Sequence, residues 1–269
     1  MAGSNRGGSG NEGRRPTKAE RREEARLQRE EIQRRMARRR RNRSLGLVLM
    51  VVAIGVAVLA VFLTSGGGGD SPVPTAAELL QQAPAGRTAA GCDAVQTTGN
   101  YADAQGDDPD IDHQHIGSAG MTSPPALSTY ATIPPASGPH DPTPLPAGIY
   151  DSPPNVYQTI HSLEHGAVII WYAPGTTGQA LDDLLAFYGQ SDEDIGQAKI
   201  IVAPYDYPDQ GTAGQLPSGA QMVLVAWHRL ETCTAVNLAA AFDFSSRFEV
   251  PGYGGRAYAG VAREPTSPM

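Results

Sequence analysis

Short apolar runs alternate with amphipathic segments along the second half of the chain. Three of these runs have the length and β-branched composition of buried strands: Ala167–Tyr172, Lys199–Ala203 and Gln221–His228. Between the first two, apolar residues recur at i, i+3, i+4 and i+7, which predicts a helix over Thr177–Gly189. A strand, a helix and a strand in this order predict a right-handed parallel crossover, and we expect the third strand to join the same sheet.

Further helices are expected on both sides of these strands. Asn155 can act as the N-cap of a short helix that runs to His165, and Gly166 is suited to the position that ends it. A last helix is predicted over Thr234–Phe248 and a short one over Thr75–Gln82.

The segment from Gly99 to Pro154 has a different composition. It is rich in Pro, Gly, Ser and Asp and lacks apolar periodicity, which is typical of extended loops. We expect an ordered wrap in which the run Pro134–His140 forms a rigid turn, because proline fixes φ and Gly138 can adopt a positive φ. The predicted fold class is α/β: a small mixed sheet with a strand-helix-strand crossover, preceded by a loop-rich Pro/Gly wrap, on a single N-terminal transmembrane helix.

The transmembrane prediction depends on Leu45–Thr64, which has no charged residue in 20 positions. A helix of this length spans the ~30 Å hydrocarbon core of a bilayer. It is longer than the ~7–15-residue apolar core of a cleaved signal peptide. Arginines abut its N-terminal end, so the positive-inside rule predicts a single-pass signal-anchor in the plasma membrane, with a cytoplasmic N-terminus and an extracytoplasmic C-terminal domain.

The charge distribution agrees with this topology. The first 44 residues hold 14 Arg and one Lys against six Glu, a net charge of +9, whereas the rest of the chain carries a net charge of −16. A basic segment next to a membrane span is expected to contact anionic lipid headgroups, at ~1 kcal/mol per basic residue near the surface. Charge alone would also allow nucleic acid as a partner, but the arginines directly beside the span favour the membrane role.

Two cysteines, Cys92 and Cys233, lie in the predicted exported part, where one disulfide between them is the simplest expectation. Free thiols or thiolate metal ligands are the alternatives. We divide the chain into a basic cytoplasmic tail (1–44), a transmembrane helix (45–64), a linker (65–90), an exported α/β domain (91–250) and a disordered tail (251–269).

The histidines suggest the chemistry. His161, Glu164 and His165 share one face of a helix, and further histidines stand upstream at His140 and at His113 or His115. Neutral imidazole is a common ligand of zinc and copper, which predicts a transition-metal site at His115, His140, His161, Glu164 and His165. Three histidines with a water would make a catalytic site, and a fuller ligand set would be structural, storage or redox.

Other interpretations remain open for this cluster. It can be a hydrogen-bonded polar group that holds loops onto the sheet. His161-x-x-Glu164-His165 also matches the inverted zinc-peptidase signature, with Glu164 as general base, although a strand follows at once and no second acidic motif is evident. A non-catalytic alternative is an envelope interaction or scaffold module that presents tyrosines to a protein partner: Tyr130, Tyr150, Tyr205 and Tyr207.

A series of motifs in order resembles an uncharacterised, mostly actinobacterial family of membrane-anchored exported domains, the domain of unknown function 3105. The motifs are His115, Pro134–His140, Gly148–Tyr150, His161–Val168, Ala226–Trp227 and Leu230–Cys233. The resemblance covers roughly residues 90–250 and implies an exported orientation and this architecture, but no established activity. Ala136 departs from it, since the family more often has Thr there.

Overall fold

The computed structural model describes residues 73–101, 109–118, 120–190, 198–252 and 256–269, all within a compact unit that spans Pro72–Met269. The predicted cytoplasmic tail and the predicted span at 45–64 lie outside the described residues. Among the helices that are described, none is both long enough and apolar enough to cross a membrane.

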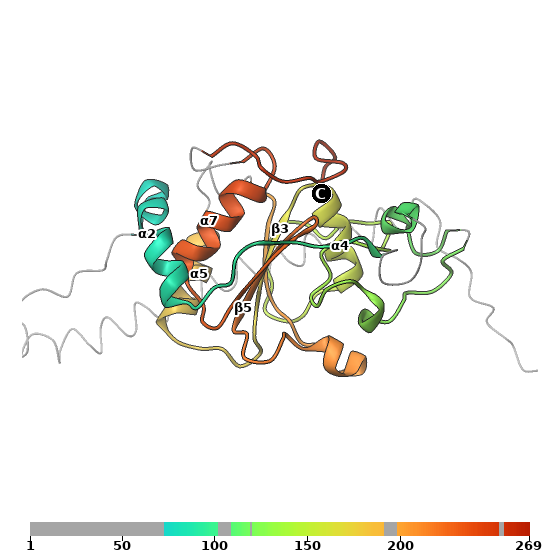
Figure 1. Ribbon diagram of the computed structural model, residues 1–269, viewed down its shortest axis with the longest axis horizontal. Coiled ribbons are helices and arrows are strands. Elements are labelled where there is room, and N and C mark those ends of the chain that lie inside the picture. Colours follow the sequence, from blue (N-terminus) through green and yellow to red (C-terminus); the bar gives the residue numbers. More distant parts are fainter. Residues whose placement is uncertain (1–72, 102–108, 119, 191–197, 253–255) are drawn as a thin grey trace, which may run out of the picture. The chain divides into compact units, whose positions relative to one another are not determined.

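A six-stranded mixed sheet forms the centre of this unit (Figure 1). Its order is β1-β6-β5-β3-β4-β2, with these bounds: β1 Gln96–Thr97, β2 Gly148–Ile149, β3 Val168–Tyr172, β4 Ile200–Pro204, β5 Met222–Ala226 and β6 Arg229–Cys233. β3 pairs with β4 in parallel, and α5, Gln179–Tyr188, lies between them in the chain, so the predicted parallel strand-helix-strand connection is confirmed. β5 pairs with β3 antiparallel, which makes the sheet mixed as expected.

The central strands are buried on both faces, because their side chains alternate between two apolar layers. On one face, Val168 and Ile170 pack with α5, α2 (Ala76–Ala89) and α7 (Leu238–Phe248). On the other face, Ile169 and Trp171 pack with α4 (Val156–Glu164) and with the wrap before it. Continuous apolar runs, without polar alternation, are what strands covered on both sides require.

The wrap is loop-rich, as predicted, and its described residues contain only short elements: the 3₁₀ helices Pro109–His113 and Leu127–Thr129, and β2. Gly138 has the positive φ that the turn was expected to need, 121°, and a Cβ there would lie 2.8 Å from Tyr130 Cε1. The loop after β4 holds another 3₁₀ segment, Pro208–Gly214.

Strand β6 was not predicted. It follows β5 through a two-residue turn, Trp227–His228, in which His228 has φ 55°. The usual Asn-Gly or Gly signals of such a turn are missing from the sequence, which is why the hairpin was not recognised. It brings Cys233 next to Cys92, and the predicted disulfide between them is present.

The short helix predicted over Thr75–Gln82 is present and longer than expected, because α2 spans Ala76–Ala89. The predicted linker over 65–90 is therefore too long. Thr75 and Glu78 make a capping box at the start of α2, and the helix continues through Pro84. Leu79, Ala83 and Gly86 are buried in α2, which packs against α7. This packing outweighs the helix-breaking tendency of Pro84, because of which the second half of the segment was predicted to be linker.

The prediction of a disordered tail over 251–269 also fails for the described residues 256–269. Lys199 Nζ donates to the carbonyl oxygens of Pro265 and Ser267, at 3.0 and 2.9 Å, and to that of His165 at 2.7 Å. An ammonium with three carbonyl acceptors holds this polar segment in place without an apolar stripe. The C-terminus therefore lies beside α4 (Figure 1).

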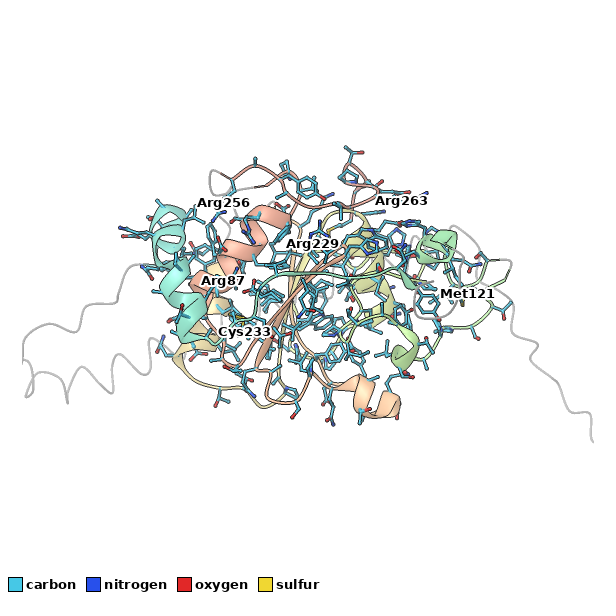
Figure 2. All side chains as sticks on the ribbon, viewed as in Figure 1. Arg87, Met121, Arg229, Cys233, Arg256 and Arg263 are labelled. Carbon is cyan, nitrogen blue, oxygen red and sulfur yellow. A yellow bond between two sulfur atoms is a disulfide. The ribbon has the colours of Figure 1, made fainter. Side chains whose placement is uncertain are left out.

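Arg87 links α2 to the sheet and to α7 (Figure 2). Its guanidinium lies 2.8 Å from Glu231 Oε1 in β6 and donates to Asp243 Oδ2 in α7 at 3.3 Å. Glu231 is fully buried, and neither of its carboxylate oxygens accepts a hydrogen bond from the described part of the chain. Burial raises the pKa of Glu231 to about 7, although the charge of Arg87 opposes the shift.

We expect Arg87→Gln to destabilise the protein more at pH 8 than at pH 5. At pH 8 the variant leaves a buried carboxylate without its cation, a change that lowers the free energy of unfolding by roughly 3–5 kcal/mol in comparable pairs. At pH 5 Glu231 is protonated in the folded protein, because its folded pKa of about 7 lies above pH 5, and little charge is lost. Denaturant unfolding at both pH values measures the difference.

The double variant Arg87→Gln/Glu231→Gln is the control for this prediction. It removes both charges, so its stability deficit should be the same at the two pH values. An equal deficit of Arg87→Gln at pH 5 and pH 8 would contradict the assigned ion pair.

Candidate metal centre

The histidine cluster lies at the edge of the sheet where β3 and β4 begin. Helix α4 ends there with Glu164 as its last residue and His165 as its C-cap. Asn155 caps the other end by accepting from Tyr157 N–H at 3.0 Å, as predicted. Gly166 has φ 83°, and a Cβ there would lie 2.3 Å from Val250 Cγ2, so only glycine allows α4 to turn directly into β3.

The wrap supplies the other histidines of the cluster. A single parallel β-bridge joins His115 to His140, with Ile116 N–H donating to His140 O at 2.7 Å and His140 N–H donating to Gln114 O at 3.0 Å. This bridge aligns the two segments of the wrap that carry these histidines. His161 from α4 then stacks on His115, with the two ring planes 15° apart.

Four predicted residues converge at this point. His115, His140, His161 and Glu164 each offer one ligand atom, and these atoms all lie within 4.8 Å of one another. The ring of His161 lies close to the other three imidazoles, centroid to centroid: 5.0 Å from His115, 4.9 Å from His140 and 4.5 Å from His165. Residues separated by up to 50 positions in the chain are thus brought to one place.

Main-chain carbonyls fix the orientation of three of the imidazoles. The Nδ1 atoms of these rings lie 2.6–2.8 Å from carbonyl oxygens: His140 from Gly138 O, His161 from Asp141 O and His165 from Pro268 O. A carbonyl can only accept, so each Nδ1 carries a proton and donates it. The neutral form of each ring then presents the lone pair of Nε2 to the cluster, as metal-bound histidines do.

Two pairs of these acceptor atoms face each other at short distance. His161 Nε2 lies 3.0 Å from His165 Nε2, and His140 Nε2 lies 3.1 Å from Glu164 Oε2. The second contact is close enough for an ion pair, but its geometry gives the buried His140 Nε2 no hydrogen-bond partner. Two lone pairs at this distance repel each other unless a proton or a metal cation lies between them.

The charge states of the inner residues follow from their surroundings. Burial lowers the pKa of His161 to about 4, so its ring is neutral near pH 7. Burial alone would raise the pKa of Glu164, but His113 and the protonated form of His140 outweigh this and hold the pKa well below its usual range. A neutral imidazole and an ionised carboxylate are the forms in which these groups bind metal.

His113 and His115, which the sequence could not distinguish, have different positions. His115 is exposed and belongs to the four-residue group. His113 lies behind Glu164, with Nδ1 2.8 Å from Glu164 Oε1, and its ring stacks on Trp227 at 5.5 Å. His113 therefore orients the carboxylate and does not face the other imidazoles.

His165 lies between His161 of the four-residue group and the C-terminal tail. Its Nε2 lies 3.4 Å from Glu264 Oε2, and Glu264 N–H donates to Glu164 O at 2.9 Å. Glu164, His165 and Glu264 form a second group whose ligand atoms lie within 4.8 Å of one another. Sequence reasoning missed Glu264, because a lone Glu in a short polar segment has no pattern that could reveal it.

The arrangement offers nitrogen and carboxylate donors, the set that suits zinc, copper or iron. The alternative peptidase reading requires Glu164 to accept a proton from water, but a carboxylate with a strongly lowered pKa is a weak base. Ser162 is not a nucleophile candidate either, since its hydroxyl donates to Leu145 O at 2.8 Å and accepts from Leu145 N–H at 2.9 Å.

The tyrosines proposed to face a partner do not form a surface. Tyr205 is fully buried and Tyr130 is 5% exposed, both in the apolar layer that contains Trp171. Tyr150 and Tyr207 are half-buried, and their hydroxyls donate to Pro146 O and Pro154 O. The structure gives this form of the scaffold hypothesis no support.

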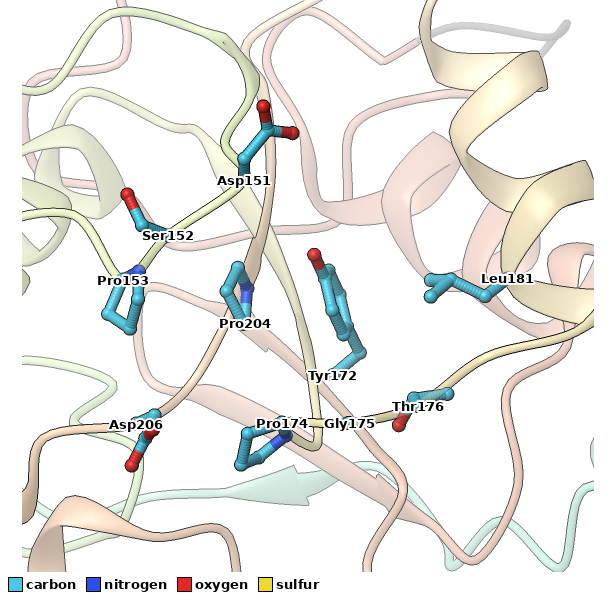
Figure 3. A pocket seen from close by; sticks show the side chains of 10 residues that line it. All are labelled: Asp151, Ser152, Pro153, Tyr172, Pro174, Gly175, Thr176, Leu181, Pro204 and Asp206. Carbon is cyan, nitrogen blue, oxygen red and sulfur yellow. The ribbon is translucent and has the colours of Figure 1, made fainter.

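A separate pocket of about 360 Å³ lies at the opposite edge of the sheet, where β3 and β4 end (Figure 3). Tyr172 and Pro204, the last residues of these strands, line it together with Asp151 and Asp206. None of its lining residues is a histidine, and it is open to solvent. We place the candidate chemistry at the imidazole cluster, where buried polar atoms converge, and not in this pocket.

Comparisons with known proteins give one family match and no activity. Residues 125–255 match the family model described as "Protein of unknown function (DUF3105)", which confirms the resemblance for this part of the chain. The match includes His140, His161, Glu164 and His165 and leaves out His115 and Glu264. No curated protein and no solved structure gives a match.

We expect Lys199→Met to release the tail that carries Glu264. The variant keeps the aliphatic stem but loses a charged donor shared by three carbonyls, and each such hydrogen bond contributes about 1.5–3 kcal/mol. Loss of even one corresponds to roughly tenfold faster opening. Hydrogen exchange measured by mass spectrometry should therefore accelerate at least about tenfold over 256–269, with the strands of the sheet little affected.

Arg263→Met is the matched control, because it removes an exposed cation from the tail itself. Its exchange should equal that of the unmodified protein. If Lys199→Met left exchange over 256–269 unchanged, the ammonium would not be what holds this segment.

Proposed function

We propose that this chain is a single-pass plasma-membrane protein whose extracytoplasmic domain binds a transition-metal ion, zinc or copper. The proposed ligands are His115, His140, His161 and Glu164. The observation that carries the proposal is the orphaned Nε2 of His140, which is fully buried, fixed by its Nδ1 hydrogen bond and 3.1 Å from a carboxylate oxygen. A buried acceptor in this position is explained by a bound cation.

The spacing of the donors supports this assignment. Two ligands of a tetrahedral zinc ion are separated by about 3.3 Å when the zinc–nitrogen bonds measure ~2.0–2.1 Å. The His140–Glu164 contact of 3.1 Å is close to that value, and the four ligand atoms of the group all lie within 4.8 Å of one another. Three neutral imidazoles and one carboxylate would leave a zinc site with a net charge of +1.

The surroundings of the group also fit a metal site. Carbonyl oxygens orient the rings of His140 and His161, and His113 orients Glu164, so each of these ligands has its own supporting partner. His115 is exposed while the other three ligands are buried, which gives an ion a route from solvent. The apolar layer that contains Trp171 lies beneath and excludes water from that side.

Zinc or copper should stabilise the purified full-length protein, and removing a ligand should abolish the effect. An ion that binds only the folded protein adds about 2.7 kcal/mol to the free energy of unfolding at a concentration of 100 Kd. For a domain of this size, that corresponds to a rise in Tm of roughly 5–11 °C. A chelator should reverse the rise, and calorimetry in the presence of each ion measures it.

The informative variants are His115→Ala, which changes an exposed side chain, and His140→Gln, which keeps a polar group in the buried position. Both should lose most of the metal-dependent stabilisation. His228→Asn is the matched control, because it removes a histidine outside the group and Asn tolerates the positive φ found there. A Tm that no transition metal raises in the unmodified protein would leave a hydrogen-bonded polar cluster as the explanation.

A further inference from the structure

The donors around the centre are too many and too widely spread for one ion. Six side chains contribute: His115, His140, His161, His165, Glu164 and Glu264. Ligand atoms on one zinc ion lie at most about 4.2 Å apart, twice the bond length, and structural zinc sites use four of them. The six separate into two groups, and Glu164 is the member that both groups contain.

From this division we infer that the centre holds two metal ions, the first bound by His115, His140 and His161, the second by His165 and Glu264, with Glu164 shared between them. The inference rests on the proposed function and extends it. Paired metal sites in proteins have ions about 3.5–4 Å apart. A carboxylate with two oxygens can bridge such a pair.

The second position is supported by the surroundings of His165. Its Nδ1 donates to Pro268 O, so the neutral ring has only a lone pair at Nε2. This atom faces two other acceptors, His161 Nε2 at 3.0 Å and Glu264 Oε2 at 3.4 Å. His165 itself is 6% exposed, so water does not fully relieve the repulsion, whereas a cation between these atoms would.

Hydrogen bonds hold Glu264 in place, as a metal ligand requires. The main chain of Glu264 is hydrogen-bonded to Glu164 O, and the carboxylate accepts from Ser267 Oγ at 3.1 Å. Lys199 Nζ donates to the carbonyl oxygens of Pro265 and Ser267, the first and third residues after Glu264. The Glu264 side chain is 52% exposed, so the second ion would be the one nearer to solvent.

Metal stoichiometry of the full-length protein tests the inference. We would equilibrate the protein with Zn²⁺ alone, remove free ion with a weak chelator, and measure bound zinc per chain by elemental mass spectrometry. The segment before residue 73 has neither histidine nor cysteine and adds no strong zinc donors of these types. The unmodified protein should hold two equivalents of zinc, and Glu264→Gln should hold one. Ser267→Ala should still hold two, because it removes a hydrogen bond to the carboxylate but no ligand.

The possible results separate this inference from the proposed function. One equivalent in the unmodified protein, whether or not Glu264→Gln changes it, would overturn the second ion and leave the metal site intact. No bound zinc, together with no rise in Tm with copper, would overturn both and would assign the close His165 contacts to an imidazolium paired with Glu264. Glu264 is exposed, so its substitution should leave the fold unchanged, and circular dichroism of the variant checks this.

Discussion

Hydrogen bonds from imidazole Nδ1 atoms to main-chain carbonyls determine what the histidine cluster can do. Each of these bonds selects one tautomer and directs the opposite nitrogen of the ring to a common point. The carbonyls come from two distant segments: the wrap, at Gly138 and Asp141, and the tail, at Pro268. The tautomers and orientations of these imidazoles therefore depend on the correct packing of the wrap and of the tail.

The sheet provides the rigid reference for these segments. β3 and β4 are covered on both faces and have no exposed residue, so their first residues are firmly placed. α4 is joined to β3 through Gly166 without a loop, which transfers this rigidity to His161 and Glu164. The wrap is less regular, but the bridge between His115 and His140 gives it one fixed point at the place where the donors meet.

Much of this architecture could be predicted because it is encoded locally. The apolar runs of β3, β4 and β5, the cap at Asn155 and the pairing of Cys92 with Cys233 need no knowledge of distant contacts. The second half of helix α2, residues 83–89, and the ordered tail could not be predicted, because α7 and the Lys199 ammonium stabilise them from far along the chain. The grouping of four predicted site residues is present in the structure, whereas metal binding stays a prediction. Glu264 could not be predicted as a site residue either, because it lies in this tail, whose position depends on Lys199.

Trp227 gives the cluster a natural optical signal. Its indole stacks on His113 and lies 6.3 Å from His140, ring centre to ring centre. The chain has only one other tryptophan, Trp171, which lies in the apolar layer against Tyr205. Indole emission is quenched by a nearby paramagnetic ion such as copper(II), whereas closed-shell zinc has no such effect. Fluorescence of a Trp171→Phe protein can thus distinguish these two ions without any added label.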